Sequence, residues 1–251
     1  MEKISLTKQI ILGDNLIELP KLPANFATMI YIDPPFNTGK VQKRSRNDIQ
    51  YDDKFDDFES FLMPRIEESL RCLTKNGSIF VHLDYREVHY IKVAMDKLLD
   101  RDKFMNEIIW SYDYGGRSKT KWSCKHDTIL WYAMNPKDYI FNFDAMDRIP
   151  YMAPGLVGPE KAARGKTPTD CWWHTIVPTN GKEKCNYPTQ KPLGVLNRLV
   201  KVHTNQGDTI LDFFCGSGTT GHAAIKNGRG YVLIDSNREA IDIAALRLAK
   251  Q

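Results

Sequence analysis

Two short loops contain the residue types that could do chemistry, and the first is Asp33-Pro34-Pro35-Phe36. The two prolines fix their own φ angles and remove two backbone donors, so this loop is stiff. A stiff loop can hold the Asp33 carboxylate and the Pro34 carbonyl oxygen at a fixed separation, beside the ring of Phe36. Such acceptors suit the amine of a nucleobase, because they draw its nitrogen toward a tetrahedral, nucleophilic shape. Taken alone, the same residues could form a proline-rich turn with Phe36 in the core.

The second loop spells G-x-G-x-x-G in Gly216-Ser217-Gly218-Thr219-Thr220-Gly221, directly after an apolar run. A glycine loop between a strand and a helix is typical of nucleotide-binding folds. The next apolar run, residues 231–234, ends in Asp235, whose carboxylate could accept hydrogen bonds from the two hydroxyls of an adenosine ribose. These residues predict a crevice for a cofactor that contains a nucleoside, and a plain tight turn is the weaker interpretation.

Asp212, just before the glycine loop, helps to choose between two such cofactors. An acidic group here would repel the pyrophosphate of a dinucleotide, but it could attract the cationic amino group of a methionine moiety. The sequence therefore favours S-adenosylmethionine. A nicotinamide-dependent oxidoreductase stays open as the alternative.

Strands and helices must bring the two loops together. The apolar patterns predict strands at 27–32, 78–83, 108–110, 128–132 and 209–214, helices at 58–73 and 86–99, a turn at 75–77, and a helix that begins at Pro192. Strand and helix alternate on both sides of a stretch with little periodicity, residues 142–187. The pattern predicts an α/β fold with a doubly wound, mostly parallel sheet.

The composition says more about the environment of the protein than about its function. The net charge of +4, from 35 basic and 31 acidic residues, is too small to identify a polyanionic partner by itself. The five cysteines include no C-x-x-C pair, so we expect no metal and a reducing environment. The first residues lack an apolar signal core, and no apolar stretch approaches the roughly 20 residues that a membrane span requires. We therefore expect a cytoplasmic protein without membrane contact.

Four motifs together resemble those of the β-class amino-methyltransferases of bacterial restriction-modification systems. Asp33-Pro34-Pro35-Phe36 resembles the catalytic D-P-P-[YFW] motif, and residues 212–220 resemble the cofactor motif D-x-F-x-G-S-G-T-T. Residues 187–192 resemble [HY]-P-T-Q-K-P, and Gly13-Asp14-Asn15-Leu16 resembles a segment near the cofactor adenine. The resemblance spans nearly the whole chain. It implies a Rossmann-like methyltransferase fold in permuted order, in which the strands before the two loops end side by side.

The resemblance implies a site-specific DNA methyltransferase that moves a methyl group from S-adenosylmethionine to the exocyclic amine of a flipped base. Asp33 instead of serine in the first motif favours adenine, although the cytosine amine, an RNA substrate and a DNA-binding protein without catalysis stay open. The expected catalytic residues are Asp33, Pro34, Pro35 and Phe36. The expected cofactor residues are Asp14, Thr189, Lys191, Asp212, Phe214, Cys215, Gly216, Ser217, Gly218, Thr219, Thr220 and Asp235.

Basic residues beside aromatic ones indicate where DNA would be held. Residues 114–126 contain no acidic residue and suit phosphate contacts and base stacking, although a solvated hairpin could have the same composition. A second basic segment follows the proline loop and could close over the flipped base. The expected DNA-binding residues are Lys43, Arg44, Arg46, Arg117, Lys119, Lys121 and Trp122.

We expect a single methyltransferase domain over residues 1–251, with a catalytic half at 1–110, a target-recognition region at 111–187 and a cofactor-binding half at 188–251. The expected partner is double-stranded DNA. The resemblance adds two further expected partners, a second copy of the chain and a cognate restriction endonuclease encoded separately.

Overall fold

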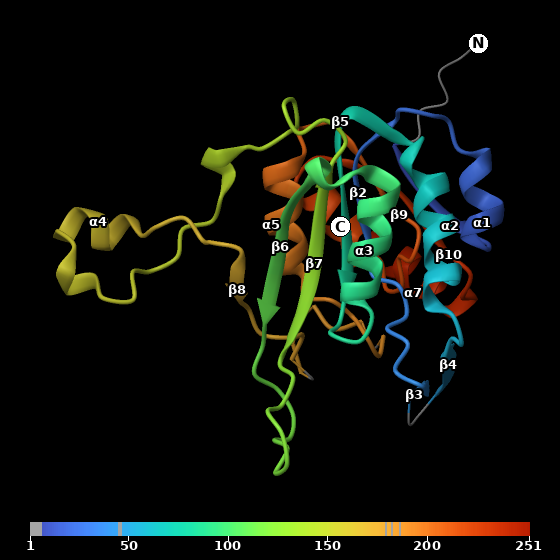
Figure 1. Cartoon of the computed structure of the whole chain (residues 1–251), viewed down its shortest axis with the longest axis horizontal. Helices are drawn as coiled ribbons and strands as arrows, with labels where there is room; N and C mark the ends of the chain where they lie inside the picture. Colours follow the sequence, from blue (N-terminus) through green and yellow to red (C-terminus); the bar gives the residue numbers. More distant parts are fainter. Residues whose placement is uncertain (1–6, 45–46, 179, 182, 186) are drawn as a thin grey trace.

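The structure is a computed structural model that describes residues 7–44, 47–178, 180–181, 183–185 and 187–251. At its centre is an eight-stranded sheet in the order β1-β10-β9-β2-β5-β7-β6-β8 (Figure 1). The first five strands in this order are parallel, β7 is antiparallel to both of its neighbours, and β8 is parallel to β6. The predicted mostly parallel sheet is confirmed.

The strands of the sheet are β1 (Lys8–Leu12), β2 (Ala27–Ile32), β5 (Leu73–Leu83), β6 (Phe104–Ser111), β7 (His126–Ala133), β8 (Cys171–Trp173), β9 (Thr209–Asp212) and β10 (Gly230–Asp235). A separate antiparallel pair consists of β3 (Lys40–Arg44) and β4 (Asn47–Asp53). The helices are α1 (Asn15–Glu18), α2 (Phe58–Leu70), α3 (Val88–Leu99), α4 (Pro159–Arg164), α5 (Leu193–His203), α6 (Thr219–Lys226) and α7 (Arg238–Leu248). Short 3-10 turns are η1 (Leu19–Lys21), η2 (Arg101–Lys103), η3 (Phe143–Ala145) and η4 (Pro154–Leu156).

Helices cover both faces of the sheet, which confirms the doubly wound arrangement (Figure 1). Successive side chains of a strand point to opposite faces, and β2 is buried along its whole length. Ile30 and Ile32 pack in the core cluster that includes residues of α2 and α3, whereas Met29 and Tyr31 pack in the cluster that includes residues of α5 and α6. A strand buried on both faces explains the uninterrupted apolar run in the sequence.

The two loops meet because β2 and β9 are neighbours. These strands pair in parallel, with Ile30 opposite Leu211, so both end at the same edge of the sheet. The chain continues from β9 to β10 on one side of this pair, and from β2 to β5 on the other side. A crevice at such a reversal of strand order is where open α/β sheets bind ligands.

Several predicted boundaries were wrong. The expected turn at residues 75–77 lies inside β5, where the pairing jumps from Ala27 opposite Leu73 to Met29 opposite Ser78, so the chain bulges without leaving the sheet. The helix expected to reach residue 73 ends at Leu70. Residues 142–187, in which no regular element was expected, contain α4 and β8, and β8 was missed because it has three residues and lies at the sheet edge.

The longest described helices, α2 and α3, have 13 and 12 residues. Across the described ranges, no helix combines the length and the apolar character needed to pass through a membrane.

We expect Ile30→Ala to lower the free energy of unfolding by about 2–5 kcal/mol, because truncating a fully buried side chain in a central strand leaves a cavity. Urea denaturation measures this loss. Ile17→Ala is the control, because Ile17 is 61% exposed and its truncation should change stability by less than about 0.5 kcal/mol. Equal effects of the two substitutions would contradict the packing described for β2.

Candidate active site

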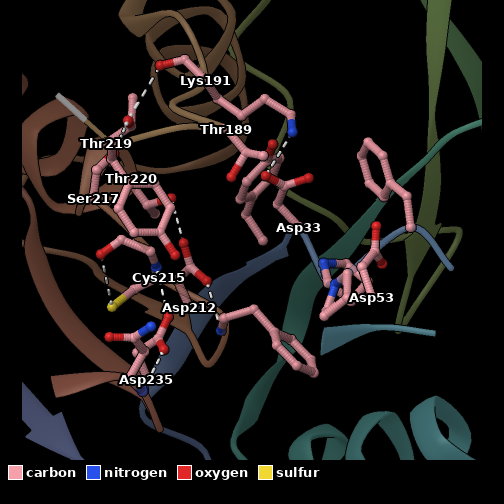
Figure 2. A pocket seen from close by; sticks show the side chains of 18 of the residues that line it. Asp33, Asp53, Thr189, Lys191, Asp212, Cys215, Ser217, Thr219, Thr220 and Asp235 are labelled. Atoms are coloured by element: carbon pink, nitrogen blue, oxygen red, sulfur yellow. Dashed lines mark hydrogen bonds and ion pairs between the residues drawn. The ribbon is translucent and has the colours of Figure 1, made fainter. Parts of the chain in front are cut away.

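A cavity of about 370 Å³ lies at the carboxyl ends of β2, β9 and β10 (Figure 2). Its walls include most of the residues selected from the sequence, namely Asp33, Pro34, Pro35, Phe36, Thr189, Lys191, Asp212, Phe214, Cys215, Gly216, Ser217, Thr219, Thr220 and Asp235. The proline loop and the glycine loop therefore form opposite parts of one site.

Two of the expected cofactor residues do not line this cavity. Gly218 precedes α6 with φ +72°, and a Cβ there would lie 2.9 Å from the Cβ of Ala244. Its place in the loop is therefore explained by close packing against α7. The Asp14 side chain accepts a hydrogen bond from the Leu16 amide and lies 3.5 Å from Arg65, so it caps α1. The role of Asp14 toward a cofactor stays a prediction.

The glycine loop is fixed by its backbone conformation and by Asp235. Gly216 has φ +47°, a conformation that glycine adopts without strain, and a Cβ there would lie 3.1 Å from the ring of Tyr187. The Gly216 and Asn237 amides donate to the two Asp235 carboxylate oxygens at 2.8 and 2.9 Å. Asp235 therefore ties the loop to the end of β10 and also lines the cavity, and its expected contact with a ribose stays a prediction.

Asp212 contributes a buried carboxyl group to the cavity wall. Thr220 Oγ1 donates to its Oδ2 at 2.6 Å, and the Phe214 amide donates to its Oδ1 at 3.0 Å. The pKa of Asp212 is raised from 3.8 to about 7, mainly because the side chain is buried. The two hydrogen bonds act to lower this pKa, and the nearby carboxylates of Asp33 and Asp235 act to raise it. A cavity with four aspartates in its wall, Asp33, Asp53, Asp212 and Asp235, is suited to a ligand that carries positive charge.

The two oxygens of the Asp33 carboxylate have different surroundings. Lys191 Nζ lies 2.6 Å from Asp33 Oδ2 and 4.7 Å from the centroid of the Phe36 ring (Figure 2). Asp33 Oδ1 is buried and has no hydrogen-bond partner among the residues that the structure describes. The structure places the Lys191 ammonium against the proline loop, and its expected contact with the cofactor stays a prediction.

A hydrogen-bonded chain behind Phe36 was not expected from the sequence. The Phe36 ring lies 5.9 Å from the His82 ring, and His82 Nδ1 and Nε2 lie 2.7 Å from the Tyr31 hydroxyl and 3.1 Å from Asp127 Oδ2. The Tyr112 hydroxyl donates to Asp127 Oδ1 at 3.0 Å. Tyr31 could have been found, because it lies two residues before Asp33 on the same strand, whereas His82 and Asp127 come from other strands.

The pKa shifts of Tyr31 and Asp127 describe the two groups on either side of His82. Burial raises the pKa of Tyr31 well above 10, so its hydroxyl keeps its proton within hydrogen-bond distance of His82 Nδ1. Burial also acts to raise the pKa of Asp127, but the hydrogen bond and charge of His82, together with the charge of Lys191, lower it overall. An ionised Asp127 only accepts, so His82 donates from Nε2. The imidazole is thereby held between Tyr31 and Asp127, against the Phe36 ring.

Four of the predicted DNA-binding residues, all on one loop, lie outside the cavity. Arg117, Lys119, Lys121 and Trp122 are exposed on the loop between β6 and β7, Arg117 pairs with Asp113, and Trp122 is 97% exposed. Because β6 runs parallel to β5 and β2, it ends at the same edge of the sheet as β2 and β9, and this loop extends beyond that edge (Figure 1). Lys43 and Arg44 belong to β3, but their side chains are not described, and Arg46 lies outside the described residues.

Comparison with known proteins gives a family match over most of the chain. Residues 27–246 match the N6/N4 methyltransferase family, which is described as DNA methylase. The DNA adenine methyltransferase YhdJ of Escherichia coli (strain K12) is 34% identical over 254 residues, which cover 96% of this chain and 82% of that protein. The type II methyltransferase M.HpaI of Haemophilus parainfluenzae is 30% identical over 246 residues, with 97% and 74% covered.

Two solved structures share the fold. The cytosine-N4-specific PvuII DNA methyltransferase superposes with a TM-score of 0.72 at 15% identity, covering 96% of this chain and 86% of that one. The M1.HpyAVI complex with S-adenosylmethionine superposes with a TM-score of 0.66 at 22% identity, with 96% and 98% covered. The permuted Rossmann-like fold expected from the sequence is confirmed.

We expect the free energy of unfolding to depend on pH through Asp212. Its pKa is raised in the folded protein, so between about pH 4 and about pH 7 the folded state holds a proton that the unfolded state has lost. The contribution of Asp212 therefore lowers stability as the pH rises through this window. Asp212→Asn should be more stable relative to wild type at pH 8 than at pH 5, as measured by urea denaturation.

Asp242→Asn removes a carboxylate that is 59% exposed and controls for the change in net charge. If the stability difference between Asp212→Asn and wild type is the same at both pH values, Asp212 is not the group that titrates.

Proposed function

Because the chain belongs to the DNA methylase family of N6 and N4 amino-methyltransferases, we propose that it methylates the exocyclic amine of adenine in double-stranded DNA. The chain is a DNA amino-methyltransferase, and its cofactor is S-adenosylmethionine. The oxidoreductase alternative has no support from the family match.

One observation carries the proposal for the substrate amine. Asp33 Oδ1 is a buried acceptor that receives no hydrogen bond from any described residue, and it belongs to a cavity that also contains the Phe36 ring. An unpaired carboxylate oxygen is costly to bury, so a donor from the substrate is the partner that the site lacks. The amine of a flipped base provides such a donor, and its aromatic ring provides a stacking partner for Phe36.

The cavity residues fit the methyl donor. S-adenosylmethionine, when bound, supplies an electrophilic methyl group on a positively charged sulfur. The carboxylates of Asp212 and Asp235 would favour its positive charges, and the glycine loop at Gly216 leaves room for close approach of a ligand to the backbone. The hydroxyl side chains at the start of α6 add hydrogen-bonding groups to the same wall.

The proline loop would activate the amine. Asp33 Oδ1 and the Pro34 carbonyl oxygen would accept its two hydrogens, which localises the nitrogen lone pair and orients it for in-line attack. Methylation makes the amine cationic and therefore acidic, so Asp33 Oδ1 can take a proton and pass it to water. No strong base is needed, which is consistent with the structural tasks of the buried His82.

Adenine is favoured over cytosine by the relatives and by the first motif. YhdJ is described as an adenine methyltransferase and is 34% identical, whereas the cytosine-specific PvuII enzyme shares only the fold at 15% identity. Asp33 occupies the position at which the family resemblance associates serine with cytosine. The loop between β6 and β7 would hold the DNA backbone beside the cavity, because its cations and Trp122 project from the same edge.

We expect purified protein and S-adenosylmethionine to convert adenine in unmethylated bacterial DNA to N6-methyladenine, and Asp33→Ala to abolish this conversion while the protein still binds DNA. The substitution removes one of the two amine acceptors but none of the expected phosphate contacts. Mass spectrometry of the digested nucleosides identifies the base, and sequencing of the methylated positions identifies the site. N4-methylcytosine as the product would overturn the choice of base, and normal turnover by Asp33→Ala would overturn the role of Asp33.

We also expect the combined replacement of Arg117, Lys119 and Lys121 by alanine to weaken DNA binding and to flatten its salt dependence by about one unit per lost phosphate contact. Binding measured at several salt concentrations gives this slope. Donor affinity should not change, because these residues lie outside the cavity.

A matched control removes one arginine and two lysines at the opposite edge of the sheet, near the start of β6 and the end of β7: Lys97, Arg101 and Lys137. If both triple variants change the salt slope equally, the effect comes from net charge and the loop has no specific role. If the first variant relaxes the choice of methylated site and leaves the slope unchanged, the loop contacts bases.

A further inference from the structure

We propose that Lys191 is a positioning residue. It fixes the positions of the Asp33 carboxylate and the Phe36 ring relative to the glycine loop. This inference rests on the proposed function, because it assigns a task to Lys191 within the methyl-transfer site. Lys191 makes three separate contacts, and each involves a different part of the site. Figure 2 shows two of them, those with Asp33 and Thr219.

The first contact orients the carboxylate. Lys191 Nζ lies 2.6 Å from Asp33 Oδ2, and the two side chains are 11% and 17% exposed. A charge-assisted hydrogen bond that is largely shielded from water is stronger and more directional than one at the surface. Because the ammonium occupies Oδ2, the carboxylate presents Oδ1, which no described residue contacts by a hydrogen bond. Lys191 thereby selects which oxygen is offered to the amine.

The second contact involves the stacking ring. The same ammonium lies 4.7 Å from the centroid of the Phe36 ring, within the range of a cation–π interaction. His82 also lies beside this ring, and Tyr31 and Asp127 hold His82 in place. One cation therefore constrains both the acceptor and the aromatic surface that a flipped base would contact.

The third contact joins Lys191 to the donor side of the cavity. Thr219, the first residue of α6, donates from Oγ1 to the Lys191 carbonyl oxygen at 3.2 Å. Arg247 donates to Thr219 Oγ1 at 2.8 Å and to the Ser217 carbonyl oxygen at 3.2 Å, so the hydroxyl belongs to a fixed network. The backbone of Lys191 is thus held by the glycine loop, while its side chain holds the proline loop.

This arrangement gives Lys191 a task that differs from binding the donor or DNA. Its ammonium is engaged by Asp33 and Phe36, and its carbonyl oxygen is engaged by Thr219. Displacement of the glycine loop would therefore move Asp33 relative to the methyl donor. A misplacement of about 1 Å between reacting groups can reduce a rate by about 100-fold.

The test compares Lys191→Met, which removes the charge at similar length, with Lys191→Arg, which keeps the charge. We expect Lys191→Met to lower the single-turnover rate of methyl transfer by about 100-fold at saturating donor and DNA. Calorimetric affinity for S-adenosylmethionine and affinity for DNA should stay close to wild type. Lys191→Arg should recover a substantial part of the rate, because it can pair with Asp33 Oδ2.

Lys184→Met is the matched control, because Lys184 lies in the same segment and lines a neighbouring cavity without contacting Asp33. It should keep the wild-type single-turnover rate. A wild-type rate in Lys191→Met would overturn the proposal, and so would a loss that appears only as weaker donor affinity. If Lys191→Met does not fold, as judged by circular dichroism, Lys191→Arg becomes the deciding variant. The proposal is overturned if the methyl-transfer rate and the donor affinity of Lys191→Arg differ from wild type as much as those of Asp33→Ala do.

The outcome for Lys191 is separate from that for the proposed function. If wild-type protein methylates cytosine instead of adenine, the base assignment fails, but the same rates still test Lys191 on that base. If wild-type protein methylates adenine and Lys191→Met does so at the wild-type rate, only the positioning role fails.

Discussion

The parallel pairing of β2 with β9 is the constraint on which the site depends. The pairing of Ile30 with Leu211 fixes the register, so both strands end at one edge of the sheet. At this edge Asp33 directly follows β2, and Asp212 is the last residue of β9. Parallel neighbours require long crossovers, and the chain between these two strands builds helices on both faces of the sheet. The cavity is a consequence of this pairing. The connection after β2 leads to β5 on one side of the pair, and the connection after β9 leads to β10 on the other side, which leaves a crevice between them.

The same pairing concentrates negative charge. Asp33, Asp212 and Asp235 line one cavity, and each is stabilised differently: Asp33 by the Lys191 ammonium, Asp235 by two backbone amides, and Asp212 by one hydroxyl and one amide. The raised pKa of Asp212 shows that its stabilisation is incomplete. Such a wall is suited to a positively charged donor, and the donor in turn would relieve the repulsion between the carboxylates.

The proline loop is held rigidly in place beside these carboxylates. Two prolines stiffen the loop itself, and the chain from Tyr31 through His82 to Asp127 supports the Phe36 ring from the adjoining strands. Asp127 also accepts a hydrogen bond from Tyr112, which lies just beyond β6, where the exposed basic loop begins. The ring and the acceptors are thus held by the sheet, whereas the residues proposed to contact DNA belong to an exposed connection.

The sequence alone was sufficient for the α/β class and for the two loops, because parallel strands buried on both faces leave uninterrupted apolar runs that end at the loops. The meeting of the two loops at one edge followed from the family resemblance. It also indicated the chemistry, since a stiff loop with two acceptors and an acidic residue before a glycine turn are local features. Only the tertiary structure decided that Lys191 contacts Asp33, that His82 supports Phe36, and that Asp14 and Gly218 lie away from the cavity wall. Those contacts join residues far apart in the chain, and they depend on strand register, on the bulge in β5 and on side-chain rotamers, none of which leaves a periodic pattern in the sequence.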